Sequence, residues 1–136
     1  MERSDCPIAN ALDLWGDKWS LLLIRDMMFE GKRHYGEFLQ AAEEISTNIL
    51  ADRLLRLEKA AIVIKHKDET NKTRYIYTLT EKGVDLLPVI VEIAMWSLHY
   101  NDHTTLNPHI VAQIKADKAK FIQTIRTALL SASVEP

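Results

Sequence analysis

Apolar residues recur at helical spacing along most of this chain, and the pattern changes to alternation only between residues 62 and 80. Stripes of apolar side chains three and four positions apart predict amphipathic helices. Asp17, Ser46 and Thr80 are placed to cap the starts of three of them. Pro88 should either kink the fifth helix or mark its true start. The expected helices span residues 7–15, 18–30, 35–42, 46–60, 80–100 and 107–130.

A short β-hairpin is expected between the fourth and fifth helices. Ile62-Val63-Ile64 is the first strand, and residues 74–80 form a second strand in which Tyr75, Tyr77 and Leu79 alternate with other side chains. Residues 65–73 contain no apolar side chain and are expected to form a polar turn. Two strands alone are marginally stable in water, so this hairpin must pack on the helices.

The fourth helix has one apolar face and one polar face. Leu50, Leu54 and Leu57 are spaced to form its buried stripe. The other face lacks the Lys/Glu mixture of a merely solvated helix and carries Thr47, Asn48, Ala51, Asp52 and Arg53. Helix, hairpin and helix in this order are the arrangement of a winged helix-turn-helix. The predicted fold class is therefore mainly α with a small β-hairpin wing (α+β), with additional C-terminal helices.

The distribution of charge distinguishes this middle segment from the rest. The whole chain has a formal net charge of −2, which argues against a protein that coats nucleic acid indiscriminately. Residues 46–82 carry eight Lys/Arg and five Asp/Glu, a net of +3. Residues 1–45 have five against nine, and residues 83–136 have four against five. A local positive excess in an acidic protein indicates a site for phosphate.

The C-terminal helices carry more apolar surface than a helix-turn-helix unit requires. Val89, Ile90, Ile93 and Trp96, with the stripe from Ile110 to Leu130, must be covered. Either they pack on their own subunit, or they pack against a two-fold partner, which is the favoured interpretation because such dimers match two half-sites about one DNA turn apart. We expect residues 1–82 to form the DNA-binding domain and residues 83–136 to form a homodimer interface.

Composition and motifs exclude several other classes of protein. With 136 residues, 47% of them hydrophobic, the chain suits one domain with an extension. It contains no Gly-rich phosphate loop, nucleophile elbow or metalloprotease helix, so no enzyme and no cofactor are expected. His99, His103 and His109 lack supporting ligands, so no metal site is expected. The longest apolar runs are too short to span a membrane and no signal peptide follows Met1, so a cytoplasmic protein is expected.

Several short motifs have a combined pattern that identifies a family. They are Cys6-Pro7, Leu14-Trp15-Gly16-Asp17-Lys18-Trp19, the run 33–38, Ile45-Ser46 with Leu50, Arg53, Leu54, Leu57 and Glu58, the run 77–83, and Leu87-Pro88. Over residues 6–100 the chain resembles the HxlR-type transcriptional regulators, winged helix-turn-helix proteins related to the MarR group. The resemblance implies a homodimeric DNA-binding repressor or activator. The glycine that usually follows this family's recognition helix is Ala61 here.

The recognition helix, residues 46–60, is expected to enter the major groove. Asn can pair bidentately with adenine and Arg with guanine, while Asp can accept from cytosine. Asp52 is therefore either a base reader or a clamp for Arg53 or Arg56. The wing, residues 65–74, is expected on the DNA backbone or in the minor groove. The candidate DNA-binding residues are Lys18, Arg33, His34, Ser46, Thr47, Asn48, Asp52, Arg53, Lys65, Lys67, Lys72 and Arg74.

Cys6, the single cysteine, is a candidate sensor. It precedes Pro7 at a helix start, and a helix N-terminus favours the reactive thiolate. An oxidant or electrophile effector is then possible, whereas the alternative is a small buried residue. Some members of the resembling family sense such compounds through an N-terminal cysteine. With no second cysteine, a switch must use a mixed disulfide, an adduct or a bond between two protomers.

Two further alternatives concern partners. Trp15, Trp19 and Trp96 could line a pocket for a small-molecule effector, although aromatic residues at helical spacing also suit a core. A winged helix can also become a protein-interaction module without DNA binding. Such a module would lose charge along the wing, whereas Lys65, Lys67, Lys72 and Arg74 remain here. Double-stranded DNA is therefore the expected partner.

Overall fold

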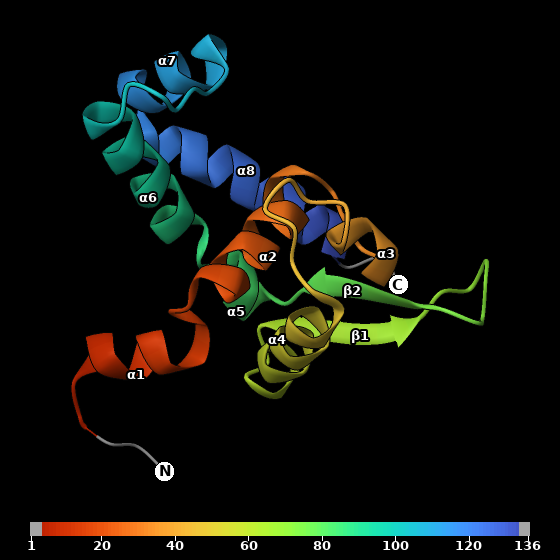
Figure 1. Ribbon diagram of the computed structural model, residues 1–136. Helices are drawn as coiled ribbons and strands as arrows, with labels where there is room; N and C mark the ends of the chain where they lie inside the picture. Colours follow the sequence, from red (N-terminus) through yellow and green to blue (C-terminus); the bar gives the residue numbers. More distant parts are fainter. Residues whose placement is uncertain (1–3, 134–136) are drawn as a thin grey trace.

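The computed structural model describes residues 4–133, which form eight helices and one antiparallel pair of strands (Figure 1). The strands are β1, Val63–Lys67, and β2, Tyr75–Leu79. A mainly helical fold with one hairpin confirms the predicted class. The helices are α1, Pro7–Trp15; α2, Lys18–Phe29; α3, Tyr35–Phe38; α4, Thr47–Lys59; α5, Glu81–Val84; α6, Leu87–Tyr100; α7, Pro108–Ala116; and α8, Lys118–Ser133.

Helix α2 is the hub of the hydrophobic core. Leu23, Ile24, Met27 and Met28 are buried along it. It contacts α4, α6 and β2, and a single cluster of buried side chains continues from it into α7 and α8. An apolar helix covered on several sides gains most of its stability from burial, about 1.5–3 kcal/mol for each large side chain. The elements that carry the candidate site are therefore attached to one support.

The three predicted N-caps are confirmed. The Asp17 carboxylate accepts from the backbone N–H of Ser20 at 3.0 Å, and the Ser46 hydroxyl accepts from Ile49 N–H at 3.2 Å. The Thr80 hydroxyl accepts from Gly83 N–H at 3.1 Å. Each bond satisfies a backbone donor that the first turn of a helix leaves free.

Two long helices expected from the apolar pattern are each interrupted. The segment 80–100 forms the short α5 and then α6, and Pro88 lies in the first turn of α6, so it marks a start and not a kink. The segment 107–130 breaks at Asp117, whose backbone is extended at φ −161° and ψ 91°. The Asp117 carboxylate then accepts from Lys120 N–H at 3.1 Å and begins α8. Apolar spacing continues across this break, which is why the pattern alone missed it.

The hairpin is longer on its first side than predicted. β1 extends to Lys67 and pairs with β2 from Val63 opposite Leu79 to Lys67 opposite Tyr75. Lys65 and Lys67 therefore lie on a strand and not in the turn, which is confined to residues 68–74. The prediction failed here because polar side chains on an exposed part of a hairpin give no apolar alternation to detect.

The C-terminal helices differ from each other in what covers them. The stripe on α7 and α8 packs on its own chain, with Ile114 and Phe121 buried and Ile125 and Leu129 against the core. For this stripe the structure therefore has the packing of the first alternative, on its own subunit, whereas the homodimer interface stays a prediction. By contrast, Trp96 on α6 is 67% exposed and Ile8 on α1 is 69% exposed. In Figure 1 both α1 and α6 lie on the left of the molecule.

The end of α4 carries backbone strain. Ala61 has φ +60°, in the left-handed region that disfavours a residue with a Cβ. Its N–H donates to Glu58 O at 3.0 Å and Ile62 N–H donates to Leu57 O at 2.9 Å, which is a Schellman motif. Ile62 is buried, so the motif fixes the direction in which the chain enters β1.

We expect Ala61→Gly to raise the free energy of unfolding by about 0.5–1 kcal/mol. The substitution removes the cost of the left-handed conformation, roughly 1–2 kcal/mol. Part of this gain is offset because glycine gives the unfolded chain more conformational freedom. Urea denaturation at constant m-value measures the change. The matched control is Ala60→Gly, because Ala60 has φ −81° and carries no such penalty. The control should lower stability, and a similar change in both variants would contradict this account.

Candidate nucleic-acid interface

Helices α3 and α4 form the helix-turn-helix unit. The Tyr35 hydroxyl on α3 donates to the carbonyl of Thr47 at 2.8 Å, and Ile45 in the connecting turn is buried. On α4 the three predicted leucines are buried, as expected. Thr47, Asn48 and Asp52 are exposed on the other face. The polar face of α4 is therefore available to a ligand.

Arg53 ties α4 to the start of α2. Its Nε donates to Asp17 Oδ2 at 2.8 Å, and its Nη1 donates to Asp52 Oδ2 at 2.6 Å. Arg56 Nη1 lies 3.6 Å from the same Asp52 oxygen. The Arg53 side chain is only 21% exposed. Of the two roles considered for Asp52, the geometry in the unbound chain is that of a clamp.

Asp17 therefore serves two elements with one carboxylate. Its partial burial by itself raises the pKa, but hydrogen bonds from Ser20 and Arg53 outweigh burial and lower the pKa of Asp17 from 3.8 to about 2. The Ser20 hydroxyl donates to Asp17 Oδ1 at 2.6 Å, while Oδ2 receives Arg53. The Asp17 carboxylate therefore stays charged across the physiological pH range. The ion pair with Arg53 that orients α4 persists over the same range.

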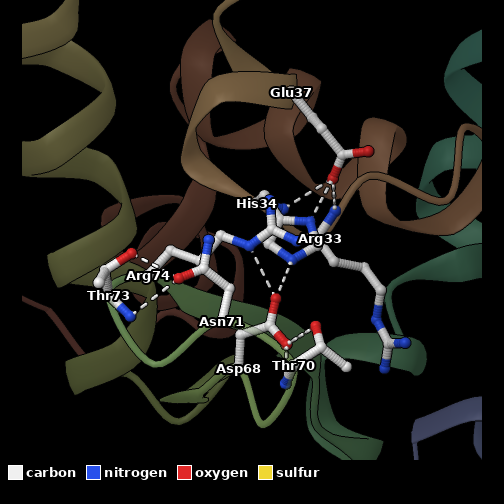
Figure 2. A network of polar contacts seen from close by, with 8 residues as sticks. All are labelled: Arg33, His34, Glu37, Asp68, Thr70, Asn71, Thr73 and Arg74. Atoms are coloured by element: carbon white, nitrogen blue, oxygen red, sulfur yellow. Dashed lines mark hydrogen bonds and ion pairs between the residues drawn. The ribbon is translucent and has the colours of Figure 1, made fainter.

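A second polar network joins the hairpin to α3 (Figure 2). The Asp68 side chain at the end of β1 is only 5% exposed. Its Oδ2 lies 2.7 Å from Arg74 Nε and 3.0 Å from His34 Nε2. The other His34 nitrogen, Nδ1, lies 3.0 Å from Glu37 Oε1, so the ring bridges a wing carboxylate and a helix carboxylate. The wing is thereby held against the helix-turn-helix unit.

The network also sets the shape of the turn. The Thr70 hydroxyl and Arg74 hold the pKa of the Asp68 carboxyl well below its usual range. Asp68 Oδ1 accepts from Thr70 N–H at 2.9 Å, and Asn71 Oδ1 accepts from Thr73 N–H at 3.1 Å. These are two successive Asx turns, which bend the chain through local hydrogen bonds. Residues 68–73 therefore form an ordered tip.

The predicted cations occupy several different surroundings. Lys65 lies with its Nζ 4.3 Å from the centre of the Tyr75 ring, and Lys18 lies 4.6 Å from that of Trp19, both as cation–π pairs. Lys67 and Lys72 are exposed. Arg74 is half-exposed although its Nε is bound. The hairpin therefore presents several cations beside α4.

Two predicted residues are engaged within the protein, and the side chain of a third, Arg33, lies away from the wing network. His34 lies inside the wing network, and the Ser46 hydroxyl caps α4. The Arg33 side chain points away from that network (Figure 2), and Arg33 lines a cavity together with Leu129 and Ala132 of α8. Trp96 lines a shallow groove on α6, whereas Trp19 lines a separate small space between α2 and the turn after α3. Cys6 is exposed at the N-cap position of α1, so it is not the buried residue of the alternative interpretation.

Sequence reasoning missed the two carboxylates that organise the site. Asp17 was expected as a helix cap, and its ion pair with Arg53 joins positions 36 residues apart. Asp68 was assigned to a polar turn, although the repeated pattern Asp68-x-Thr70 and Asn71-x-Thr73 is a signal for Asx turns. Tyr35, which fixes α3 to α4, was missed because its hydroxyl bonds to a backbone carbonyl.

Comparison with known proteins agrees with this geometry. The HxlR-like helix-turn-helix family matches residues 14–105. The chain belongs to this family. The match covers α2, the helix-turn-helix unit, the hairpin and α6, and it ends before α7 and α8. HxlR-like proteins are transcriptional regulators and not enzymes, which confirms the predicted class.

Individual HxlR-like relatives are similar over the same region. An HTH-type transcriptional regulator of Synechocystis, sll1512, is 36% identical over 86 residues, which are 63% of this chain and 63% of that one. The regulator YodB of Bacillus subtilis is 35% identical over 98 residues, covering 71% of this chain and 87% of YodB. The redox regulator HypR in its oxidised form superposes with a TM-score of 0.63 at 30% identity, over 71% of this chain and 99% of HypR.

Residues 4–133 contain no helix that is both long and apolar enough to cross a membrane.

Proposed function

We propose that this HxlR-like chain is a sequence-specific DNA-binding transcriptional regulator that acts as a homodimer. The observation that carries the proposal is the exposed polar face of α4, fixed to α2 by the Asp17–Arg53 ion pair and flanked by a cationic hairpin. In this proposal residues 1–82 bind DNA, and α6 within the C-terminal part 83–136, together with α1, holds two protomers at the spacing of two half-sites. An oriented polar helix beside a basic hairpin suits one major groove and its adjacent backbone.

Helix α4 reads bases in this proposal. Asn48 is exposed near the helix start and presents an amide that can pair bidentately with adenine. Thr47 beside it can contact a base edge or a thymine methyl group. Arg53 orients the helix through Asp17 and could reach guanine only by exchanging those bonds for base contacts. Asp52 pairs with Arg53, and the positive charge of Arg53 reduces the repulsion between the Asp52 carboxylate and DNA phosphate.

The hairpin supplies contacts that do not depend on sequence. Lys67 and Lys72 are exposed along it, and Arg74 keeps half of its side chain in solvent. Lys65 and Lys18 add charge close to aromatic rings. Such cations release counterions from DNA and steer association, while base contacts provide the discrimination. Asp68 and His34 support this surface by holding the wing to α3.

The faces of α1 and α6 are proposed as the dimer interface. Helix α1 has nine residues and none of them is buried, yet isolated helices shorter than about 12–15 residues are marginal in water. Ile8 and Leu12 are exposed on it, and Ile93, Trp96 and Tyr100 are exposed on α6. A shallow apolar groove on α6 includes Ile93 and Trp96. A second copy would cover both helices at once.

Cys6 is proposed as an oxidant or electrophile sensor within that dimer. It is exposed at the beginning of α1, so a modification there would act directly on the proposed interface. The similarity to HypR, a redox regulator, supports this assignment. Because the chain has one cysteine, a disulfide would join two protomers or a small thiol.

The first test measures binding to the DNA upstream of the chain's own gene by fluorescence anisotropy, across a salt series and against random competitor. Asn48→Ala should cost about 1–3 kcal/mol on the specific fragment and little on random DNA. Lys72→Ala should weaken both and lower the salt slope by about one. Lys120→Ala on α8 is the matched control and should change neither. Wild-type protein that binds no DNA even at low salt would contradict the proposal and favour a protein-interaction module.

The dimer is tested by Ile93→Glu, which places a charge in the apolar groove of α6. We expect sedimentation velocity at micromolar concentration to show a dimer for the wild type and a monomer for the variant, because an unpaired charge is costly in an interface. Leu106→Glu, at a similarly exposed leucine in the loop after α6, should remain dimeric. A monomeric wild type, or a dimeric Ile93→Glu variant, would argue against this interface.

The sensor is tested with diamide, which takes up the two thiol hydrogens as a disulfide forms. Treatment should change operator affinity several-fold in the wild type and leave Cys6→Ser unaffected. A dithiothreitol wash should restore the original affinity. If the wild-type affinity does not move while mass spectrometry shows Cys6 oxidised, the sensor role is refuted.

A further inference from the structure

A cavity of about 300 Å³ lies between the end of α2, strand β2 and helix α8. Its walls are largely apolar and include Met27, Met28, Leu79, Val84 and Leu129. In Figure 1, α8 passes behind α2 towards α3 and β2. Small-molecule sites of this size are mostly apolar, with a few polar groups that fix the orientation of the ligand.

The wall formed by α8 does not come from the family's shared region. The family match ends at residue 105, whereas Leu129 and Ala132, which line the cavity, lie on α8. Helix α8 is fixed in place by Arg126, which donates to Asp85 and Glu81 at 2.9 Å each, and by the buried Phe121. The wall of the cavity that α8 forms is therefore held in place by contacts within this chain.

Two cations stand at the edge of the cavity. Lys32 Nζ lies 3.4 Å from the buried Asp26 carboxylate and is partly neutralised by it. Arg33 differs, because no hydrogen bond or ion pair joins its guanidinium to any residue within 4–133, although its backbone carbonyl accepts from Tyr77 N–H at 2.8 Å. Its side chain is only partly exposed, and Figure 2 shows it directed away from Asp68. A partly buried guanidinium beside an apolar cavity favours an anion as its partner.

We propose that this cavity binds a small amphipathic monoanion, a medium-length aliphatic carboxylate. The apolar tail lies among Met27, Met28 and Leu129, and the carboxylate binds Arg33. This assigns Arg33 to the ligand and not to DNA. The backbone carbonyl of Arg33 accepts a hydrogen bond from Tyr77 N–H in β2. A ligand that binds the Arg33 side chain therefore displaces this strand of the wing and lowers the affinity for DNA. That regulatory consequence rests on the proposed function, whereas the binding itself does not.

The binding step is tested by isothermal titration of the full chain with octanoate, and with octanamide as its neutral counterpart. Octanoate should bind saturably and at least about tenfold more tightly than octanamide, since a hydrogen bond to a charged group is worth about 1.5–3 kcal/mol. Arg33→Met should remove this preference, while Lys120→Met on α8 should not. Ala132→Trp should block the cavity, and because Ala132 is exposed, that substitution does not enter the core.

Circular dichroism and thermal unfolding establish that each variant is folded before titration. Equal binding of octanoate and octanamide, or unchanged binding by folded Arg33→Met, would overturn the site. The regulatory step is measured as operator affinity with and without octanoate. It should fall at least several-fold in the wild type and stay constant in Ala132→Trp. Octanoate binding without any effect on operator affinity would refute only the regulatory step. Octanoate binding by a protein that binds no DNA would refute the proposed function and leave the cavity site established.

Discussion

Burial of helix α2 is the constraint on which the rest of this structure depends. Leu23, Ile24, Met27 and Met28 cannot be covered by any single neighbour, so α4, β2 and α6 approach the same helix from different directions. Close packing leaves little freedom in those approaches, because side chains in a core interdigitate. The positions of the recognition helix and of the hairpin therefore follow from how one apolar helix is enclosed.

Hydrogen bonds and ion pairs then fix the orientations of α4 and of the hairpin, which packing alone leaves adjustable. Asp17 joins α2 to Arg53, and Asp68 joins the hairpin to His34 and Arg74. Exposed ion pairs contribute little stability, but a carboxylate shared by several donors restricts geometry more than a single contact does. In both networks one acidic side chain holds a basic one at the edge of the candidate DNA surface. An acidic protein can in this way present an ordered basic surface without a large excess of positive charge.

The C-terminal extension beyond the region matched by the family consists of α7 and α8, and these helices belong to the core of their own chain. Helices α7 and α8 pack back on their own chain, so the apolar stripe from Ile114 to Leu129 contributes to the core. Exposed apolar surface remains on α1 and α6 instead. The same extension forms one wall of the cavity beside Arg33 and so places a ligand-sized space next to the strand that forms the wing.

Local physical chemistry determined what could be predicted from the sequence. The caps at Asp17, Ser46 and Thr80 and the leucine stripe of α4 act within one or two helical turns, so residue order alone reveals them. The order helix, hairpin, helix and the family motifs identified the winged fold for the same reason. The burial of Asp68 and the Asp17–Arg53 pair depend on residues distant in sequence, and only the tertiary structure decided them. It also decided which apolar helices are covered, because a stripe shows that a face needs a partner and does not show which surface provides it.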